Sequence, residues 1–307
     1  MTAVHAARPA LAGKVSNRTT ADRVRRRLAV GAVLATFPYS ALKVAWLCRS
    51  RIGLSDAKFG TSATMHLLNT ATLGLDLVAL ALALVFFTGA RAPRWFLLPT
   101  MWVGYGLLGQ IVMIIGPSVI VQATTGPPTD ASSAATPIAG WVYAAVYTGF
   151  SGLGLCLLPA FAIYAWQRWG ADRGWGERLA GVRRDRLPKL PALATATLVL
   201  ALVVRSAFAD SALEAMGPAI DAVIGLMALA GLWSGVAGRP RRLRRAVPMA
   251  VVWTASGAWT AWGVYHLVLQ TVPNDLVTGQ VAGIDIALSA AKALTGASLL
   301  FAIRRIS

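Results

Sequence analysis

The stretch NTATLGLDLVALALALVFF, residues 69–87, is apolar almost throughout and long enough to cross a lipid bilayer. A helical crossing needs about 20 apolar residues, because the hydrocarbon core is about 30 Å thick and a helix rises about 1.5 Å per residue. Near the middle of this run lies Asp76. An ionised carboxylate at that depth costs at least ~2.5–3.5 kcal/mol to insert, so Asp76 must face something other than lipid.

The composition of the whole chain is typical of a membrane protein. Its 307 residues are 56% hydrophobic and 13% charged, with a mean hydropathy of +0.61. Soluble domains average about 45–50% apolar and about 25% charged residues. Crossings are predicted at 28–48, 64–88, 96–117, 139–166, 191–211, 217–237, 247–271 and 283–303. None of these runs alternates like a strand of a membrane barrel, so we predict an all-α, polytopic transmembrane bundle of eight helices.

The basic residues between the apolar runs predict the orientation. With the amino terminus in the cytoplasm, 23 of the 29 Lys and Arg residues fall in cytoplasmic segments and three in outer loops. This bias follows the positive-inside rule, so we predict a multi-pass protein of the cell (plasma) membrane with both termini cytoplasmic. The net charge of +17 is spread over the loops. We therefore expect contacts with anionic lipid headgroups and no nucleic-acid binding.

The basic segments also divide the chain. We predict a disordered basic cytoplasmic tail at 1–27, four-helix halves at 28–166 and 191–303, a basic cytoplasmic linker at 167–190 and a cytoplasmic carboxyl terminus at 304–307. The segments GARAPRWFLLP (89–99) and GRPRRLRRAVP (238–248) share Gly and Pro ten residues apart, with basic residues between them. This match suggests a 4+4 parallel internal repeat, with chance as the alternative.

Ten polar residues within the runs are the candidates for function. Six are ionisable, three of each sign, and the others share a helical face with one of them. The polar stripes of the second and eighth runs begin at the same outer membrane face, so we predict one cavity open to the outside. Asp76 is expected to pair with Lys43 or, as a second choice, with Lys292. The predicted intramembrane polar cluster is Lys43, His66, Asn69, Thr72, Asp76, Arg205, Asp221, Asp285, Ser289 and Lys292.

Structural explanations stay open for the same residues. The cations nearest the outer ends of their runs, Lys43 and Arg205, can snorkel to the interface. The carboxylates of Asp221 and Asp285 lie near span ends, within reach of water. The deeper charges can form a structural ion pair that locks two helices, and the uncharged polar residues can form hydrogen bonds between helices.

The sequence lacks the common catalytic motifs. GFSGLG (149–154) has Leu153 where G-x-S-x-G needs glycine, and there is no Walker A loop, GxGxxG or HExxH. The two cysteines, Cys48 and Cys156, are isolated, as small core residues usually are. We therefore expect no metal and no cofactor, with a haem held by His66 and His266 as the alternative.

The segment YSALKVAWL (39–47) places Tyr39, Lys43 and Trp46 on one helical face. This pattern resembles eight-span integral membrane proteins of high-GC Gram-positive (actinobacterial) bacteria, and the Ala- and Arg-rich composition fits that source. The resemblance covers the first span and otherwise only the number of spans, and CRSRIG (48–53) replaces the glycine-rich exit of those proteins. It implies the eight-span fold and no particular activity. Haem A synthase is similar in its four-plus-four layout, but it uses paired membrane histidines, and we do not adopt it.

Three functions remain. The first is a small-solute transporter or permease-like protein with a polar cavity open to the extracellular side. The second is a membrane enzyme or haem-type cofactor protein that uses His66 and His266. The third is a structural or regulatory membrane subunit whose ion pairs only hold helices together. We favour the first, because the predicted polar stripes lie on one side of the membrane.

Overall fold

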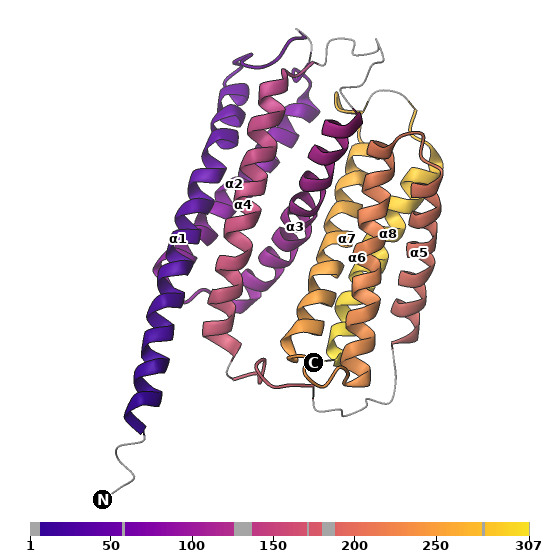
Figure 1. Ribbon diagram of the computed structural model, residues 1–307. Coiled ribbons are helices and arrows are strands. Elements are labelled where there is room, and N and C mark those ends of the chain that lie inside the picture. Colours follow the sequence, from indigo (N-terminus) through magenta and orange to yellow (C-terminus); the bar gives the residue numbers. More distant parts are fainter. Residues whose placement is uncertain are drawn as a thin grey trace, which may run out of the picture.

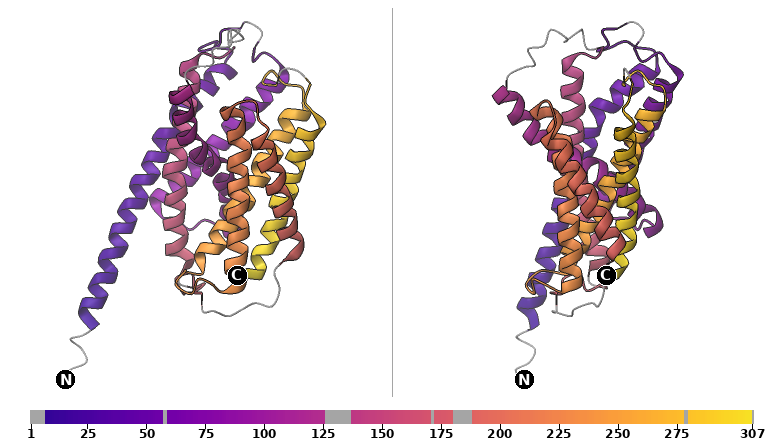
Figure 2. Two further views of the ribbon diagram at one scale, coloured as in Figure 1. Left: turned by 45° about the vertical axis from the view of Figure 1, so that its right-hand side comes forward. Right: turned by 90° about the vertical axis from the view of Figure 1, so that its right-hand side faces the viewer.

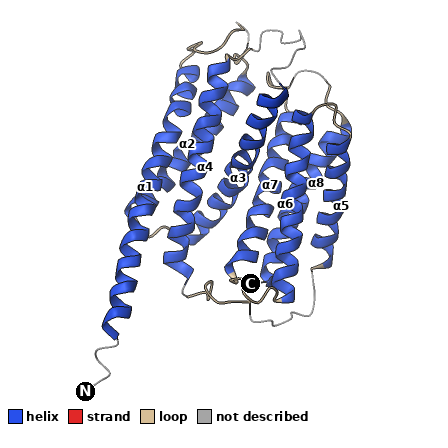
Figure 3. Ribbon diagram, in the orientation of Figure 1, coloured by secondary structure: helices blue, strands red, loops and turns tan. Residues whose placement is uncertain are grey.

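The computed structural model describes residues 7–56, 59–125, 137–170, 172–179, 188–277 and 280–306. Over these residues the chain is α-helical with connecting loops and no β-strand (Figures 1 and 3). The helices are α1 (Ala7–Leu47), α2 (Ala63–Thr88), α3 (Arg94–Thr125), α4 (Gly140–Ala165), the π-helical turn η1 (Trp166–Gly170), α5 (Lys189–Ala207), α6 (Ala212–Ala237), α7 (Ala246–Thr271) and α8 (Gly283–Ile306). For this part of the chain, the predicted all-α class with eight helices is confirmed.

Seven of the eight helices are long and apolar enough to cross a membrane, and α7 is the exception. It has 26 residues, as many as α2, α4 and α6, so it is not shorter. It packs on α3, α6 and α8, so neighbouring helices cover much of its surface. Small and polar residues such as Ser256, Gly257 and Gly263 are buried there. The lower hydropathy of α7 thus reflects its contacts with protein rather than a reduced length.

Helices α1 and α8 define the two ends of the bundle. α1 begins and α8 ends at the same end (Figures 1 and 2), which we call the inner end. The opposite end, where α1 ends and α2 begins, is the outer end. The helices run in alternating directions between the two ends, as a series of membrane crossings requires.

Two hydrophobic cores hold the bundle together. The first buries side chains from α1 to α4 and from η1, with Phe86 and Leu97 fully enclosed. The second buries side chains from α5 to α8, with Leu232 and Trp259 fully enclosed. Helix α3 joins the two cores, because it packs on α4 on one side and on α6 and α7 on the other.

The contact between α3 and α7 depends on two glycines. A Cβ atom placed on Gly106 would lie 2.3 Å from the backbone oxygen of Gly257, so the two backbones approach too closely for any side chain there. One turn away along α3, Trp102 Nε1 donates a hydrogen bond to Ser256 Oγ at 2.8 Å. The close approach of Gly106 to Gly257, which we call the α3–α7 crossing, sets the position of the first core relative to the second.

The two segments that suggested an internal repeat share a local feature. Gly89 ends α2 and Gly238 ends α6, both in the left-handed conformation with φ of 73° and 62°, which glycine adopts without strain. The prolines are not equivalent, because Pro248 lies in the first turn of α7 whereas Pro99 lies in the second turn of α3. The helices differ as well: α6 packs on α7, but α2 does not pack on α3. The repeat stays a prediction.

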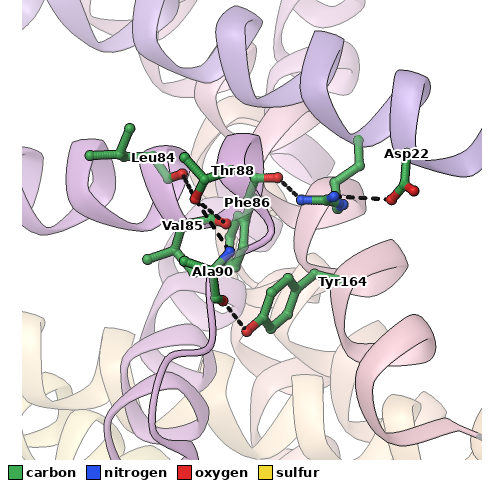
Figure 4. A network of polar contacts seen from close by, with 8 residues as sticks. Asp22, Leu84, Val85, Phe86, Thr88, Ala90 and Tyr164 are labelled. Atoms are coloured by element: carbon green, nitrogen blue, oxygen red, sulfur yellow. Dashed lines mark hydrogen bonds and ion pairs between the residues drawn. The ribbon is translucent and has the colours of Figure 1, made fainter.

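The basic segment before the first apolar run is helical over residues 7–27, where the sequence predicted disorder. Arg25 anchors the last part of this segment. Its buried guanidinium donates a hydrogen bond to the backbone oxygen of Phe86, in the last turn of α2, and pairs with Asp22 at 3.0 Å. A cation is favoured at the carboxyl end of a helix. Figure 4 shows this network beside the 2.8 Å hydrogen bond from Tyr164 to the Ala90 carbonyl.

The predicted linker 167–190 lies partly outside the described residues, which include 167–170, 172–179 and 188–190 of it. Its first residues form η1, with Trp169 buried against the first core. The backbone N–H of Leu179 donates to the oxygen of Leu243 at 2.9 Å, and the N–H of Arg245 donates to the oxygen of Glu177 at 2.8 Å. These bonds attach the linker to the connection between α6 and α7 at the inner end.

Candidate functional site

Asp76, the charge in the middle of the stretch at 69–87, pairs with Lys43. Lys43 Nζ on α1 donates to Asp76 Oδ2 on α2 at 2.9 Å, and Ser40 Oγ donates to the same oxygen at 3.0 Å. The ammonium group also lies 3.9 Å from the centre of the Tyr39 ring, a cation–π contact. The expected first partner of Asp76 is confirmed. The snorkelling explanation for Lys43 is wrong, because its side chain is fully buried.

Lys292, the second-choice partner of Asp76, pairs elsewhere. Its Nζ on α8 donates to Asp221 Oδ2 on α6 at 2.6 Å, and Gln110 Nε2 on α3 donates to Asp221 Oδ1 at 3.0 Å. Both charges are buried, so the idea that water solvates Asp221 at its span end is wrong. Sequence reasoning followed charges and missed Gln110, although an amide within an apolar run was an available signal. The cluster links three helices, as a structural ion pair would.

The third pair lies at the outer end. Arg205 on α5 approaches Asp285 on α8 at 3.2 Å and Glu214 on α6 at 4.0 Å. All three side chains are substantially exposed, and exposed pairs contribute only about 0–1 kcal/mol to stability. Each of the six predicted ionisable residues therefore has an opposite charge beside it, but the three pairs lie in different places.

A cavity of about 760 Å³ opens near the outer end of the first half. The polar stripe of α2 contributes His66, Asn69 and Thr72 to its lining. The Thr72 hydroxyl donates to the oxygens of Leu68 and Asn69 in its own helix, at 2.9 and 3.2 Å, so it does not tie α2 to another helix. We call this space the outer cavity. Its other named lining residues come from α1, α3, α4, α7 and the connecting loops.

A second space, of about 580 Å³, lies deeper between α2 and α3. We call it the groove. The Lys43–Asp76 pair lines it, together with apolar side chains of α2, α3 and α4. The groove and the outer cavity share the lining residues Tyr39, Thr72, Ile111, Phe150, Trp262 and Tyr265. The two spaces therefore meet, and the ion pair lies beyond their junction.

The aromatic wall of this junction was largely missed by sequence reasoning. Tyr39 had been placed on the face of Lys43, whereas Phe150 of α4 and Trp262 and Tyr265 of α7 were not predicted to belong to a site. Trp262 could have been found from its position one helical turn before His266, which places both residues on one face of α7. Only the tertiary packing, in which α4 contacts α1 and α3 while α7 contacts α3, places these rings together.

The structure does not bring the ten predicted site residues into one cluster. The stripe of α2 lines the outer cavity, whereas the stripe of α8 does not: Ser289 is buried, with its backbone against Gly263 of α7. The prediction of one cavity lined by both helices is therefore wrong. The physical reason is that α8 packs on α7 and α5 in the second core, while α2 packs on α1 and α4 in the first.

The two membrane histidines also differ in place. His66 lines the outer cavity, whereas His266 packs its ring against Trp262 and Tyr265, at 5.5 and 5.8 Å between ring centres, and is not among the cavity's lining residues. Within the described part of the chain, no group of three or more His, Cys, Asp or Glu residues is arranged to hold a metal ion.

Comparisons with known protein families, curated proteins and solved structures yielded no match for this chain. The class of protein therefore rests on the fold itself. Seven long apolar helices and charges that are paired inside the bundle define a multi-pass integral membrane protein.

Proposed function

We propose that the protein is a transporter or permease-like protein that binds a small solute in the outer cavity. The observation that carries this proposal is the continuity of the outer cavity with the groove, whose lining includes the buried Lys43–Asp76 pair. Solute sites usually lie in concave spaces of about 300–1,000 Å³ with a few polar groups among apolar walls. A charge pair near the bilayer centre is costly, and such residues often mark a solute pathway.

The placement of this site in the cell follows from the loop charges. We propose that the inner end is cytoplasmic and that the outer cavity faces the outside of the plasma membrane, because the basic residues gather at the inner end. Those basic residues would then meet anionic lipid headgroups. We also keep the relationship to the eight-span actinobacterial proteins as a proposal, because the shared Tyr39–Lys43–Trp46 face lies at this site: Tyr39 lines the junction, Lys43 the groove and Trp46 the outer cavity.

The other two functions find less support. A bis-histidine haem needs both rings at one space, whereas only His66 lines the outer cavity. A structural role suits the Asp221–Lys292–Gln110 cluster, in which Asp221 and Lys292 are buried and bonded within the second half. It does not account for the outer cavity, which a purely structural bundle has no need to keep open.

Cysteine accessibility tests the proposal with a matched control. Thr72 lines the outer cavity, so the cysteine of Thr72→Cys should react with a small charged thiol reagent added outside intact cells. Ser289 belongs to the similar polar stripe of α8 but is buried. A cysteine at this position should stay unreactive, because a dry site disfavours the reactive thiolate. Both variants are made after Cys48 and Cys156 are replaced by Ala. An unreactive Thr72→Cys would overturn the proposed function.

A further inference from the structure

The groove exists because two consecutive helices are held apart. Helices α2 and α3 do not pack on each other, whereas the corresponding pair in the second half, α6 and α7, packs closely. Helices α1, α4 and α7 supply the back of the groove through Tyr39, Phe150 and Trp262. The space between these two helices is therefore left open to an occupant.

The walls of the groove suit hydrocarbon. Apart from the Lys43–Asp76 pair and two threonines, its lining is mainly aliphatic and aromatic. Leu75 on α2 and Phe96 on α3 lie along it and are both exposed, so the groove borders the surface that meets lipid. From Thr72 to Leu82 it follows α2 for ~15 Å at 1.5 Å per residue. That length equals one leaflet of a hydrocarbon core ~30 Å thick.

The outer cavity has the opposite character. Among its described lining residues the formal charges belong to Arg49 and Arg51, both positive, beside His66. Arg51 also donates to the backbone oxygen of Asp56, and the Asp275 carboxylate accepts from the Gly60 N–H at 2.9 Å. In the groove the two charges compensate each other. The outer cavity therefore offers the exposed Arg49 to an anionic group, while the groove favours an uncharged chain.

Resting on the proposed function, we propose that the solute is an anionic amphiphile. Its carboxylate or phosphate headgroup lies in the outer cavity near Arg49, and its hydrocarbon chain lies in the groove between α2 and α3. The shared junction at Tyr39, Thr72 and Ile111 joins the two parts of one ligand. Because lipid tails are as apolar as the groove, the chain gains little from hydrophobic burial, and the headgroup supplies selectivity.

Two glycines of α3 provide a matched test of the groove. Gly104 lines the groove, and a Cβ there meets only Met101 Cε at 4.0 Å, so the backbone accommodates a side chain and Gly104→Leu adds bulk to the groove. Gly109 lies on the same helix with nothing within 4 Å and does not line the groove, so Gly109→Leu is the control. The full-length protein in phosphatidylcholine nanodiscs is labelled by palmitic acid that carries a diazirine near its methyl end. We expect labelling to fall about tenfold in Gly104→Leu, which corresponds to about 1.4 kcal/mol of binding free energy, and to persist in Gly109→Leu.

The headgroup is tested in the same nanodiscs. Arg49→Asn should reduce labelling, because asparagine tolerates the left-handed backbone at this position, where φ is 64°, and removes the charge. Arg49→Lys keeps the charge and should retain labelling. Competition by unlabelled palmitate identifies a free single-chain ligand, and competition by phosphatidylglycerol identifies a membrane phospholipid. Either result supports the proposal.

As a control, palmitic acid is replaced by an alkyl amine of the same chain length that carries the same diazirine. Equal labelling of the Gly104→Leu and Gly109→Leu variants, or labelling by the amine equal to that by palmitic acid, would mean that only bulk lipid is detected and would overturn the inference. The proposed function would survive that result if Thr72→Cys still reacts with the external reagent. An unreactive Thr72→Cys, in contrast, removes the solute site itself. The two failures are therefore distinguishable.

Discussion

Removing one charge from the Lys43–Asp76 pair is expected to cost far more stability than removing both. The side chain of Lys43 is 0% exposed and that of Asp76 is 6% exposed, with 2.9 Å between Nζ and Oδ2. At an effective dielectric constant of about 20, this separation gives an attraction of about 6 kcal/mol. Asp76→Asn keeps the shape of the side chain but leaves the Lys43 ammonium uncompensated in apolar surroundings. We expect a loss of about 3–5 kcal/mol in the free energy of unfolding.

The double variant Asp76→Asn/Lys43→Met should recover most of that loss. With both charges gone, neither bears a desolvation cost without its partner, and such replacements are often neutral within about 1 kcal/mol. The free energy of unfolding is measured in mixed micelles by titration with dodecyl sulfate, followed by tryptophan fluorescence. The yield of folded protein in mild detergent gives a second readout for variants too unstable to titrate.

The control combination is Asp76→Asn with Lys292→Met. Because Lys292 pairs with Asp221 at 2.6 Å, this combination leaves two charges unpaired, and it should be less stable than Asp76→Asn alone. Rescue of Asp76→Asn by Lys292→Met, or strictly additive losses for Asp76→Asn and Lys43→Met, would refute the pairing on which this reasoning depends.

Two further predictions concern orientation and packing. In a chain without native cysteines, the exposed positions Ser55→Cys and Arg241→Cys should differ: an impermeant maleimide should label the first in intact cells and the second only after lysis, and the reverse pattern would invert the topology. Gly106→Ala should destabilise the protein by about 1–3 kcal/mol or more, because its Cβ would lie 2.3 Å from Gly257 O. Gly109→Ala, with open space around it, should instead be neutral or gain up to about 1 kcal/mol, and equal stability of the two variants would contradict the α3–α7 crossing.

Sequence reasoning was most successful for single helices. An apolar run of about 20 residues has few stable alternatives to a helix in lipid, because its backbone groups must bond within the segment. The same physics predicted that Asp76 needs a partner, and the neighbouring run supplied Lys43. It failed for residues 7–27, which are helical. At Arg25 the reason is that a basic side chain is expected in water unless a buried acceptor, here the Phe86 carbonyl, is known.

The candidate site shows where prediction from sequence stops. Helical spacing placed His66, Asn69 and Thr72 on one face of α2, and these residues do line the outer cavity. Spacing also placed Ser289 in a similar stripe on α8, yet that residue is buried between helices. Periodicity describes one helix at a time and carries no information about which neighbour covers a face.

The sequence by itself therefore determined the helices, the membrane class and the need of each deep charge for a partner, because these follow from the cost of placing polar groups in hydrocarbon. Only the tertiary structure decided that Lys292 binds Asp221, that α2 and α3 stay apart, and that Phe150 and Trp262 meet at the junction. These features depend on close approach between backbones distant in sequence, such as Gly106 against Gly257. Such contacts are set by the shapes of two helix surfaces together, which neither segment specifies alone.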